Sequence, residues 1–200
     1  AYEINGNRFI PIGVSFKFTQ IEDSFESVRI YETGQMEVFQ NELFFRVFYS
    51  NTFKIAPNKS INNPTSGGVW YRTTTDRRDL DLICEQVNKA KYSGKLVASA
   101  DSDAFKGHIA FVVTWVNITT NEQNFFNTFQ LILTTDSERK KFFVVYNFDE
   151  FDSVFENVQS CVPLSFNGTY LNLDATTTIS NCRIVLYNSC RFQVYTVFLF

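Results

Sequence analysis

Apolar and polar residues alternate with a period of two along much of the chain, and this pattern constrains the fold more than any other feature. Such alternation predicts β-strands with one buried and one solvent-facing side. It holds over residues 14–18. Segments 28–31 and 36–39 flank a polar stretch in which Gly34 can adopt the positive φ of a tight turn, so they predict a hairpin. Residues 43–49 are nearly all apolar and predict a strand covered on both sides.

Further strands are predicted later in the chain. Both faces of segment 109–116 are largely apolar, so we expect a central strand of a sheet that is covered on both sides. A polar turn at 135–140 predicts a hairpin between two strands, and the Pro, Asn, Ser and Gly residues of 56–68 predict an exposed loop. The predicted strands in this part are 69–72, 109–116, 128–134, 141–148, 183–187 and 191–200.

One stretch changes to a helical period. Thr75 or Asp76 can cap the start of this helix, and Gly94 can end it. Its apolar stripe consists of Leu80, Ile83, Val87 and Ala90. The predicted fold class is therefore α+β and mainly β: antiparallel, sandwich-like sheets with one principal helix packed on them.

Composition supports a packed β domain. Phe accounts for 23 of 200 residues, whereas Gly (8) and Pro (4) are few, which favours long, tightly packed strands. We find no internal repeat or linker and predict one domain over residues 1–200. Its abrupt apolar ending favours a fragment of a larger multidomain protein.

The net charge of −3 argues against nucleic acid as a partner, and no apolar run reaches the roughly 18 residues of a membrane span.

Few residues of the chain are candidates for catalysis or metal binding. His108 is the single histidine, so multi-histidine metal sites are excluded and only one imidazole base is available. We interpret it as a strand-edge residue. The acidic stretches 101–103 and 149–152 could offer oxygens to calcium but lack the spacing of a calcium loop, and we interpret them as solvated. The sequence predicts no catalytic residue, cofactor or metal.

The four cysteines allow disulfides. Cys84 stands alone and three others lie near the C-terminus, so complete intrachain pairing must join Cys84 to one of the three. Such a bond closes a loop of at least 77 residues and constrains the unfolded chain by about 4 kcal/mol. The alternative is four buried free thiols. The predicted disulfide cysteines are Cys84, Cys161, Cys182 and Cys190.

Three N-x-S/T sequons mark candidate glycosylation sites: Asn58, Asn117 and Asn167. A chain this rich in Asn, Ser and Thr contains about three by chance, so they do not by themselves indicate secretion. Asn117 would have to lie at the exposed end of its strand to carry a glycan.

Adjacent phenylalanines point to a possible partner surface. Two neighbours in a strand face opposite ways, so some rings of these pairs are expected to be exposed. The pairs are Phe44-Phe45, Phe125-Phe126 and Phe142-Phe143.

Three segments taken in order resemble the core motif of the nidogen-type extracellular (NIDO) domain. Residues 110–116 contain Val-Thr-Trp, residues 127–133 begin Asn-Thr-Phe-Gln, and residues 143–148 contain Tyr-Asn. Residues 55–57 (Ile-Ala-Pro) and 66–72 are similar to the segment that precedes the helix in that family. Weaker likeness covers 14–18, 27–38, 180–181 and 191–194. Asn58, Asn62 and Asn63 stand where the family pattern carries aspartates.

The resemblance implies an extracellular module of the kind found in nidogens, tectorins, membrane mucins and sushi–nidogen–EGF proteins, with no catalysis by this domain. It implies secretion or an ectodomain anchored through another part of its parent protein, and it favours disulfides and glycans. We expect a non-catalytic role in matrix assembly or cell-matrix adhesion, with matrix or cell-surface proteins as partners. The rivals are a lectin-like, carbohydrate-binding module using Trp70 or Tyr71 and an enzyme using His108.

Overall fold

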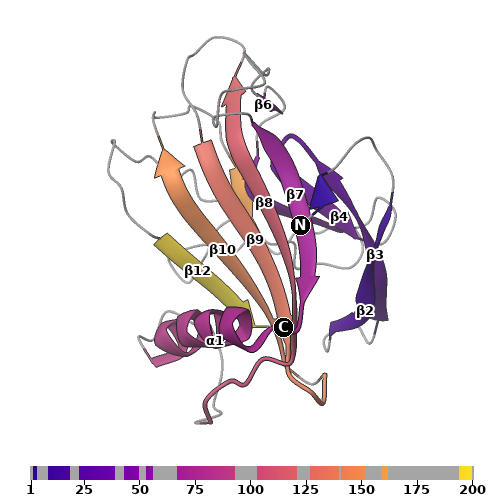
Figure 1. Ribbon diagram of the computed structural model, residues 1–200, viewed down its shortest axis with the longest axis vertical. Coiled ribbons are helices and arrows are strands. Elements are labelled where there is room, and N and C mark those ends of the chain that lie inside the picture. The colour runs from indigo at the N-terminus through magenta and orange to yellow at the C-terminus, as the bar shows by residue number, and fades with distance from the viewer. Residues whose placement is uncertain are drawn as a thin grey trace.

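In the residues that it describes, the computed structural model has three layers: a small β-sheet, a large β-sheet and one helix (Figure 1). It describes residues 2–3, 9–18, 23–38, 43–49, 53–55, 67–92, 103–120, 127–139, 141–151, 159–161 and 194–199.

The large sheet is antiparallel throughout its described strands. Its order is β1-β7-β8-β9-β10-β12, and β6 pairs with the far end of β8. Strands β8, β9 and β10 lie side by side, so the three segments of the NIDO-like motif adjoin one another. The bounds are Tyr2–Glu3 (β1), Phe53–Ile55 (β6), Gly68–Thr74 (β7), Ile109–Thr120 (β8), Asn127–Thr135 (β9), Phe142–Phe151 (β10) and Val194–Leu199 (β12).

The small sheet has the order β11-β5-β4-β3-β2 and is also antiparallel. Gly34 adopts φ +83° in the turn between β3 and β4, which confirms the predicted hairpin and its glycine. The bounds are Ile10–Phe18 (β2), Asp23–Tyr31 (β3), Gln35–Val38 (β4), Leu43–Tyr49 (β5) and Gln159–Cys161 (β11).

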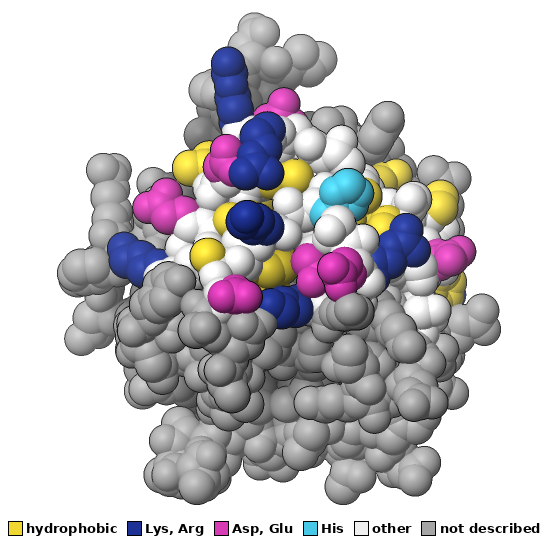
Figure 2. Space-filling model, turned by 90° about the horizontal axis from the view of Figure 1, so that it is seen from below, with side chains coloured by type: hydrophobic (Ala, Val, Ile, Leu, Met, Phe, Trp, Pro, Cys, Tyr) yellow, Lys and Arg dark blue, Asp and Glu magenta, His cyan; other side chains and the backbone are white. Residues whose placement is uncertain are grey.

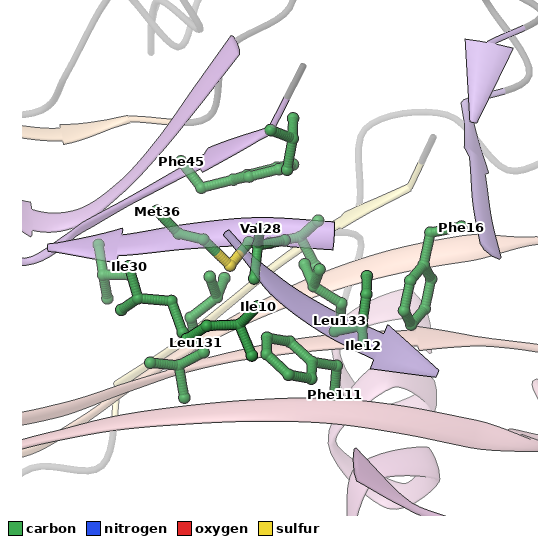
Figure 3. Close-up of a cluster of buried hydrophobic side chains, with 14 of the residues drawn as sticks. Ile10, Ile12, Phe16, Val28, Ile30, Met36, Phe45, Phe111, Leu131 and Leu133 are labelled. Atoms are coloured by element: carbon green, nitrogen blue, oxygen red, sulfur yellow. The ribbon is translucent and has the colours of Figure 1, made fainter. Parts of the chain in front are cut away.

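The main core lies between the two sheets (Figure 3). Alternate residues of every long strand point into it, as the period of two predicts. The Thr73 hydroxyl also donates to the Ile12 carbonyl at 2.7 Å and ties β7 to β2. The largest side chains in this core with under 2% exposure are Trp115, Tyr146, Phe16, Phe45, Phe111, Phe129 and Phe142.

Helix α1 (Arg77–Tyr92) covers part of the other face of the large sheet. Asp76 Oδ1 accepts from the Arg78 amide at 2.9 Å and from the Asp79 amide at 3.4 Å, so Asp76 is the N-cap, one of the two predicted caps. The helix and sheet form a second apolar cluster of Leu80, Ile83, Val87, Phe105, Ala110, Val112, Ile132, Phe143 and Val145. The sandwiched central strand predicted at 109–116 is therefore confirmed.

Several predictions fall outside the described residues. These are the loop at 56–66, the helix stop at Gly94 and the strand at 183–187. No helix in the described ranges is both long and apolar enough to cross a membrane.

Candidate functional site

A row of polar side chains crosses the large sheet on the face that α1 partly covers. Cross-strand register pairs Thr114 of β8 with Gln130 of β9, and Gln130 with Asn147 of β10. Directly opposed residues point to the same side of an antiparallel sheet. Trp70 of β7 pairs with Thr114 and extends the row. We call Trp70, Thr114, Gln130 and Asn147 the polar row; all four are half-buried.

Hydrogen bonds fix the orientation of this row. Asn147 Nδ2 donates to Gln130 Oε1 at 3.2 Å, and Gln130 Nε2 donates to Thr114 Oγ1 at 2.9 Å. Asn147 Nδ2 also lies 3.5 Å from Gln86 Oε1 on α1, which links the row to the helix. The two bonds that Asn147 Nδ2 donates fix the orientation of its amide. In this orientation Asn147 Oδ1 is buried and has no hydrogen-bond partner. One buried acceptor of this row therefore remains unsatisfied.

The Trp70 indole lies against the sheet because residue 68 has no side chain. A Cβ at Gly68 would come within 2.4 Å of Trp70 Cη2, so the six-membered ring occupies the space above that glycine. The Trp70 side chain thus presents a flat aromatic face beside Thr114. Tyr71 points to the opposite side, where it packs against the main core and lies 6.0 Å from Phe111 between ring centroids.

The alternate residues of the same motif fill the main core. Trp115 and Phe129 stack at 5.3 Å between ring centroids, and Tyr146 is 1% exposed. Burial raises the pKa of Tyr146 well above its ordinary value. The Trp115 indole N–H donates to the Tyr31 carbonyl at 2.8 Å and so fastens the large sheet to the β3–β4 hairpin. These residues hold the scaffold together.

Asn127 and Thr128 stabilise a bulge in β8. The register between β8 and β9 shifts between Trp115 and Ile118, and Asn117 there has φ +53°. Asn127 Nδ2 donates to the Ile118 carbonyl at 3.3 Å, and Thr128 Oγ1 accepts from the Asn117 amide at 3.4 Å. Asn tolerates left-handed backbone better than most residues, which gives Asn117 a structural role at this position.

A buried charge group lies on the β3–β4 hairpin. The Tyr31 hydroxyl donates to fully buried Glu37, and Arg29 Nη1 lies 3.5 Å from Glu37 Oε2. Burial, and then the hydrogen bond to Glu37, raise the pKa of Tyr31. With Trp115 bonded to the Tyr31 carbonyl, this group sets the position of the hairpin relative to the large sheet.

A second ion pair joins α1 to β7. Arg72 Nη1 lies 2.7 Å from Asp79 Oδ2, and the Thr74 hydroxyl donates to the same oxygen at 2.9 Å. Burial of Asp79 acts to raise the pKa of its carboxyl, but the bonds from Thr74 and Arg72 outweigh it, so the pKa is lowered. The charge of Arg72, two residues after Trp70 on β7, is therefore neutralised by Asp79.

The residues considered for catalysis do not converge within the described ranges. His108 is exposed and lies directly before the first residue of β8. Its backbone amide donates to the Thr135 carbonyl at 2.8 Å, which fits a strand-edge residue. Its imidazole belongs to an end of the molecule where side chains of both charges mix with small hydrophobic areas (Figure 2). No group of three or more metal-binding side chains gathers in this part of the chain.

The structure describes one of the predicted disulfide cysteines in full. Cys84 is a free thiol on α1, and its Sγ accepts from the Gly107 amide at 2.9 Å. Cys161 lies in β11, and Cys182 and Cys190 lie outside the described residues. Pairing of these cysteines stays a prediction that peptide mapping under non-reducing conditions can test.

Of the candidate glycosylation sites, the structure describes only Asn117. It lies inside β8, three residues before its end, and it is half-buried, so it does not meet the condition of lying at an exposed strand end. Asn58 and Asn167 fall outside the described residues. Occupancy of the three sequons stays a prediction.

The expectation of exposed rings is wrong for Phe142-Phe143. Phe142 is 1% and Phe143 3% exposed, because the small sheet covers one face of β10 and α1 covers the other. Phe45 is also buried, whereas the side chain of Phe44 and the pair Phe125-Phe126 are not described. The one exposed large hydrophobic side chain in the described ranges is Leu82 of α1, at 63%.

The polar row is not evident from the sequence, although three of its members belong to the three-segment motif. Thr114, Gln130 and Asn147 each neighbour a core aromatic residue in sequence. Alternation therefore places them together on the opposite face once the three strands adjoin. The missing information was the register between strands, which a single sequence does not supply.

Comparison with family models found one match, to the nidogen-like domain, over residues 27–162. The matched range spans β3 to β11 and includes α1, the polar row and the core aromatic residues. Neither the curated proteins nor the solved structures gave a match. This family is one of extracellular domains, and the match extends over more than half of the chain. The chain belongs to the nidogen-like domain family.

Proposed function

We propose that this domain is a non-catalytic, extracellular protein-interaction module that acts in matrix assembly or cell-matrix adhesion. The strongest support is that the described residues of the family motif pack the core or bond to the backbone. Trp115 and Tyr146 pack the core and Asn127 bonds to the backbone at a bulge, so the described motif residues build a scaffold. A rigid scaffold is what a module needs to present surfaces to other proteins.

The outer face of α1 is the surface that we assign to a protein partner. Leu82 is 63% exposed there, and Arg78 and Glu85 on the same face are also exposed. An apolar side chain surrounded by charges of both signs suits the centre of a small interface with a polar rim. It takes the place of Phe142-Phe143, which the structure buries.

Binding to deposited extracellular matrix tests the proposal. The secreted domain should bind decellularised matrix saturably, and Leu82→Glu should weaken binding by about tenfold, since a charge at an interface centre is costly to desolvate. Asp81→Asn is the control, because its partner Arg77 is also exposed and the change leaves Leu82 in place. Failure of the folded wild-type domain to bind any matrix preparation would contradict the proposed role.

The lectin-like alternative is favoured by a separate observation, the flat and half-buried Trp70 beside three neutral polar side chains. The sequence offers Trp70 or Tyr71 for this role. They lie on opposite faces of β7, so only Trp70 belongs to the polar row.

A further inference from the structure

We infer that the polar row is a binding site for a neutral glycan, with Trp70, Thr114 and Gln130 contacting the sugar and Asn147 positioning Gln130. This inference does not rest on the protein-interaction role, which uses the outer face of α1. It rests on the geometry of the row, on its lack of charge and on the buried polar atom that it leaves unpaired.

The row combines the two kinds of contact that a sugar ring requires. The Trp70 indole lies flat over Gly68, so its other face can stack on the apolar face of a pyranose ring. Next to it, Thr114 carries a hydroxyl. Gln130 Nε2 donates one of its two hydrogens to Thr114, so the second can bond to a ligand. The Thr114 hydroxyl and the Gln130 amide, 2.9 Å apart on adjacent strands, can each bond to a hydroxyl of the same sugar.

The polar row also destabilises the fold through an unpaired buried oxygen, which packing of this face does not require. Neighbouring positions on the same face are apolar, namely Val112, Ile132 and Val145. Asn147 donates both hydrogens, to Gln130 and Gln86, but its own Oδ1 is buried and unpaired. A buried unpaired carbonyl is destabilising, and a leucine would avoid the loss. The bond to Gln130 Oε1 turns Gln130 Nε2 toward Thr114, which is the arrangement that the site uses.

The electrostatics favour a neutral ligand. The four members of the row are uncharged, and the adjacent Arg72 and Asp79 pair with each other at 2.7 Å. The cross-strand register places Glu3 of β1 opposite Trp70, so the next residue along the row is acidic and disfavours an anionic ligand. A sialylated or sulfated glycan would therefore have to compete with Asp79 for the Arg72 guanidinium. A protein partner is less well matched, because the row offers amides and a hydroxyl in place of a large apolar anchor.

The test begins with an array of neutral oligosaccharides ending in hexose or N-acetylhexosamine, with their sialylated and sulfated counterparts. The best neutral oligosaccharide is then titrated into the whole chain. We expect binding that changes little between about 50 and 500 mM salt, since no ion pair forms. Trp70→Leu and Gln130→Leu should each weaken it by about tenfold or more. Tyr71→Phe, on the other face of β7, should leave it unchanged.

Asn147→Leu separates a positioning role from a structural one. It should weaken glycan binding by about tenfold while the midpoint of chemical unfolding changes little. Removal of the buried unpaired oxygen offsets the loss of the bonds to Gln130 and Gln86, whose half-buried amides can bond to water. If Asn147→Leu lowers the unfolding midpoint and leaves glycan binding intact, the residue is structural and the inference is wrong.

Three other outcomes overturn the site itself. They are the absence of any neutral glycan bound at about 1 mM, preference for sialylated or sulfated glycans, and undiminished binding by folded Trp70→Leu. Loss of a protein partner with Trp70→Leu, in a chain that binds no glycan, would assign the row to protein recognition.

Discussion

Trp115 joins the two sheets both by packing and by a hydrogen bond. Trp115→Phe removes the indole N–H that donates to the Tyr31 carbonyl and leaves a cavity in a fully buried site. We expect the free energy of unfolding, measured by urea titration, to fall by about 2–3 kcal/mol. Trp70→Phe, at a half-buried position, should cost less than about 1 kcal/mol. Equal losses for the two variants would mean that Trp115 does not bridge the sheets.

Asn117 is held in a left-handed conformation, with φ +53°, at the bulge of β8. Asn117→Ala should lower the free energy of unfolding by about 1 kcal/mol, because a Cβ without a compensating polar group is strained there. Asn117→Gly should be close to neutral. Both variants also remove the sequon, so unglycosylated protein must be used throughout. A glycine variant less stable than the alanine variant would argue against the positive φ.

Individual residues were predictable where local backbone chemistry decides their role. Gly34 and the cap at Asp76 follow from turn and helix-start preferences alone. The bond from Trp115 to Tyr31 was not predictable, because it joins residues 84 apart in the chain. The polar row likewise depends on which residues of three strands stand opposite one another.

Helix α1 depends on its N-cap. Asp76→Ala removes the acceptor for the Arg78 and Asp79 amides, so we expect a loss of about 1 kcal/mol in the free energy of unfolding. Asp81→Ala removes an exposed pair with Arg77 on the same helix and should cost less than about 0.5 kcal/mol. Guanidinium titration of the two variants side by side measures the difference. If Asp81→Ala were the more damaging, the cap would not be what begins this helix.

The contact between α1 and β7 should weaken in acid. The pKa of Asp79 is lowered by Thr74 and Arg72, against the opposing effect of burial, from an ordinary value of 3.8. A lowered pKa in the folded state adds stability that is present above about pH 4 and is lost as the pH falls through the folded pKa.

The free energy of unfolding should therefore fall more steeply below pH 4 in the wild type than in Asp79→Asn. Asp81→Asn, which removes an exposed carboxylate from the same helix, serves as the control and should follow the wild type. Parallel curves for wild type and Asp79→Asn would contradict the lowered pKa.

Elements with strong periodicity were predicted well. β5 occupies the predicted residues 43–49, and α1 begins directly after a predicted cap. β8 is longer than its predicted range because the bulge at Asn117 lets the strand continue to pair with β6 and β9. β2 starts four residues before its predicted range, where Pro11 and Gly13 obscure the alternation and the register to β3 shifts.

At the scale of the molecule, the sequence predicted the layers but not which rings they cover. Phe142 and Phe143 face opposite sides of β10, and each side is covered by a different layer. Whether the second face of a strand is buried depends on where the helix packs, and this is a long-range property. The expectation of exposed phenylalanines failed at Phe142-Phe143 for this reason.

The central claim is that the family motif forms one sheet with two uses: aromatic residues inside the sandwich and a polar row outside it. Nuclear Overhauser effects in the folded chain test it most directly. We predict contacts between the rings of Trp115 and Phe129, between the Trp115 indole proton and residue Tyr31, and between the side-chain amides of Gln130 and Asn147. A well-dispersed spectrum of folded protein that lacks these contacts would contradict the account.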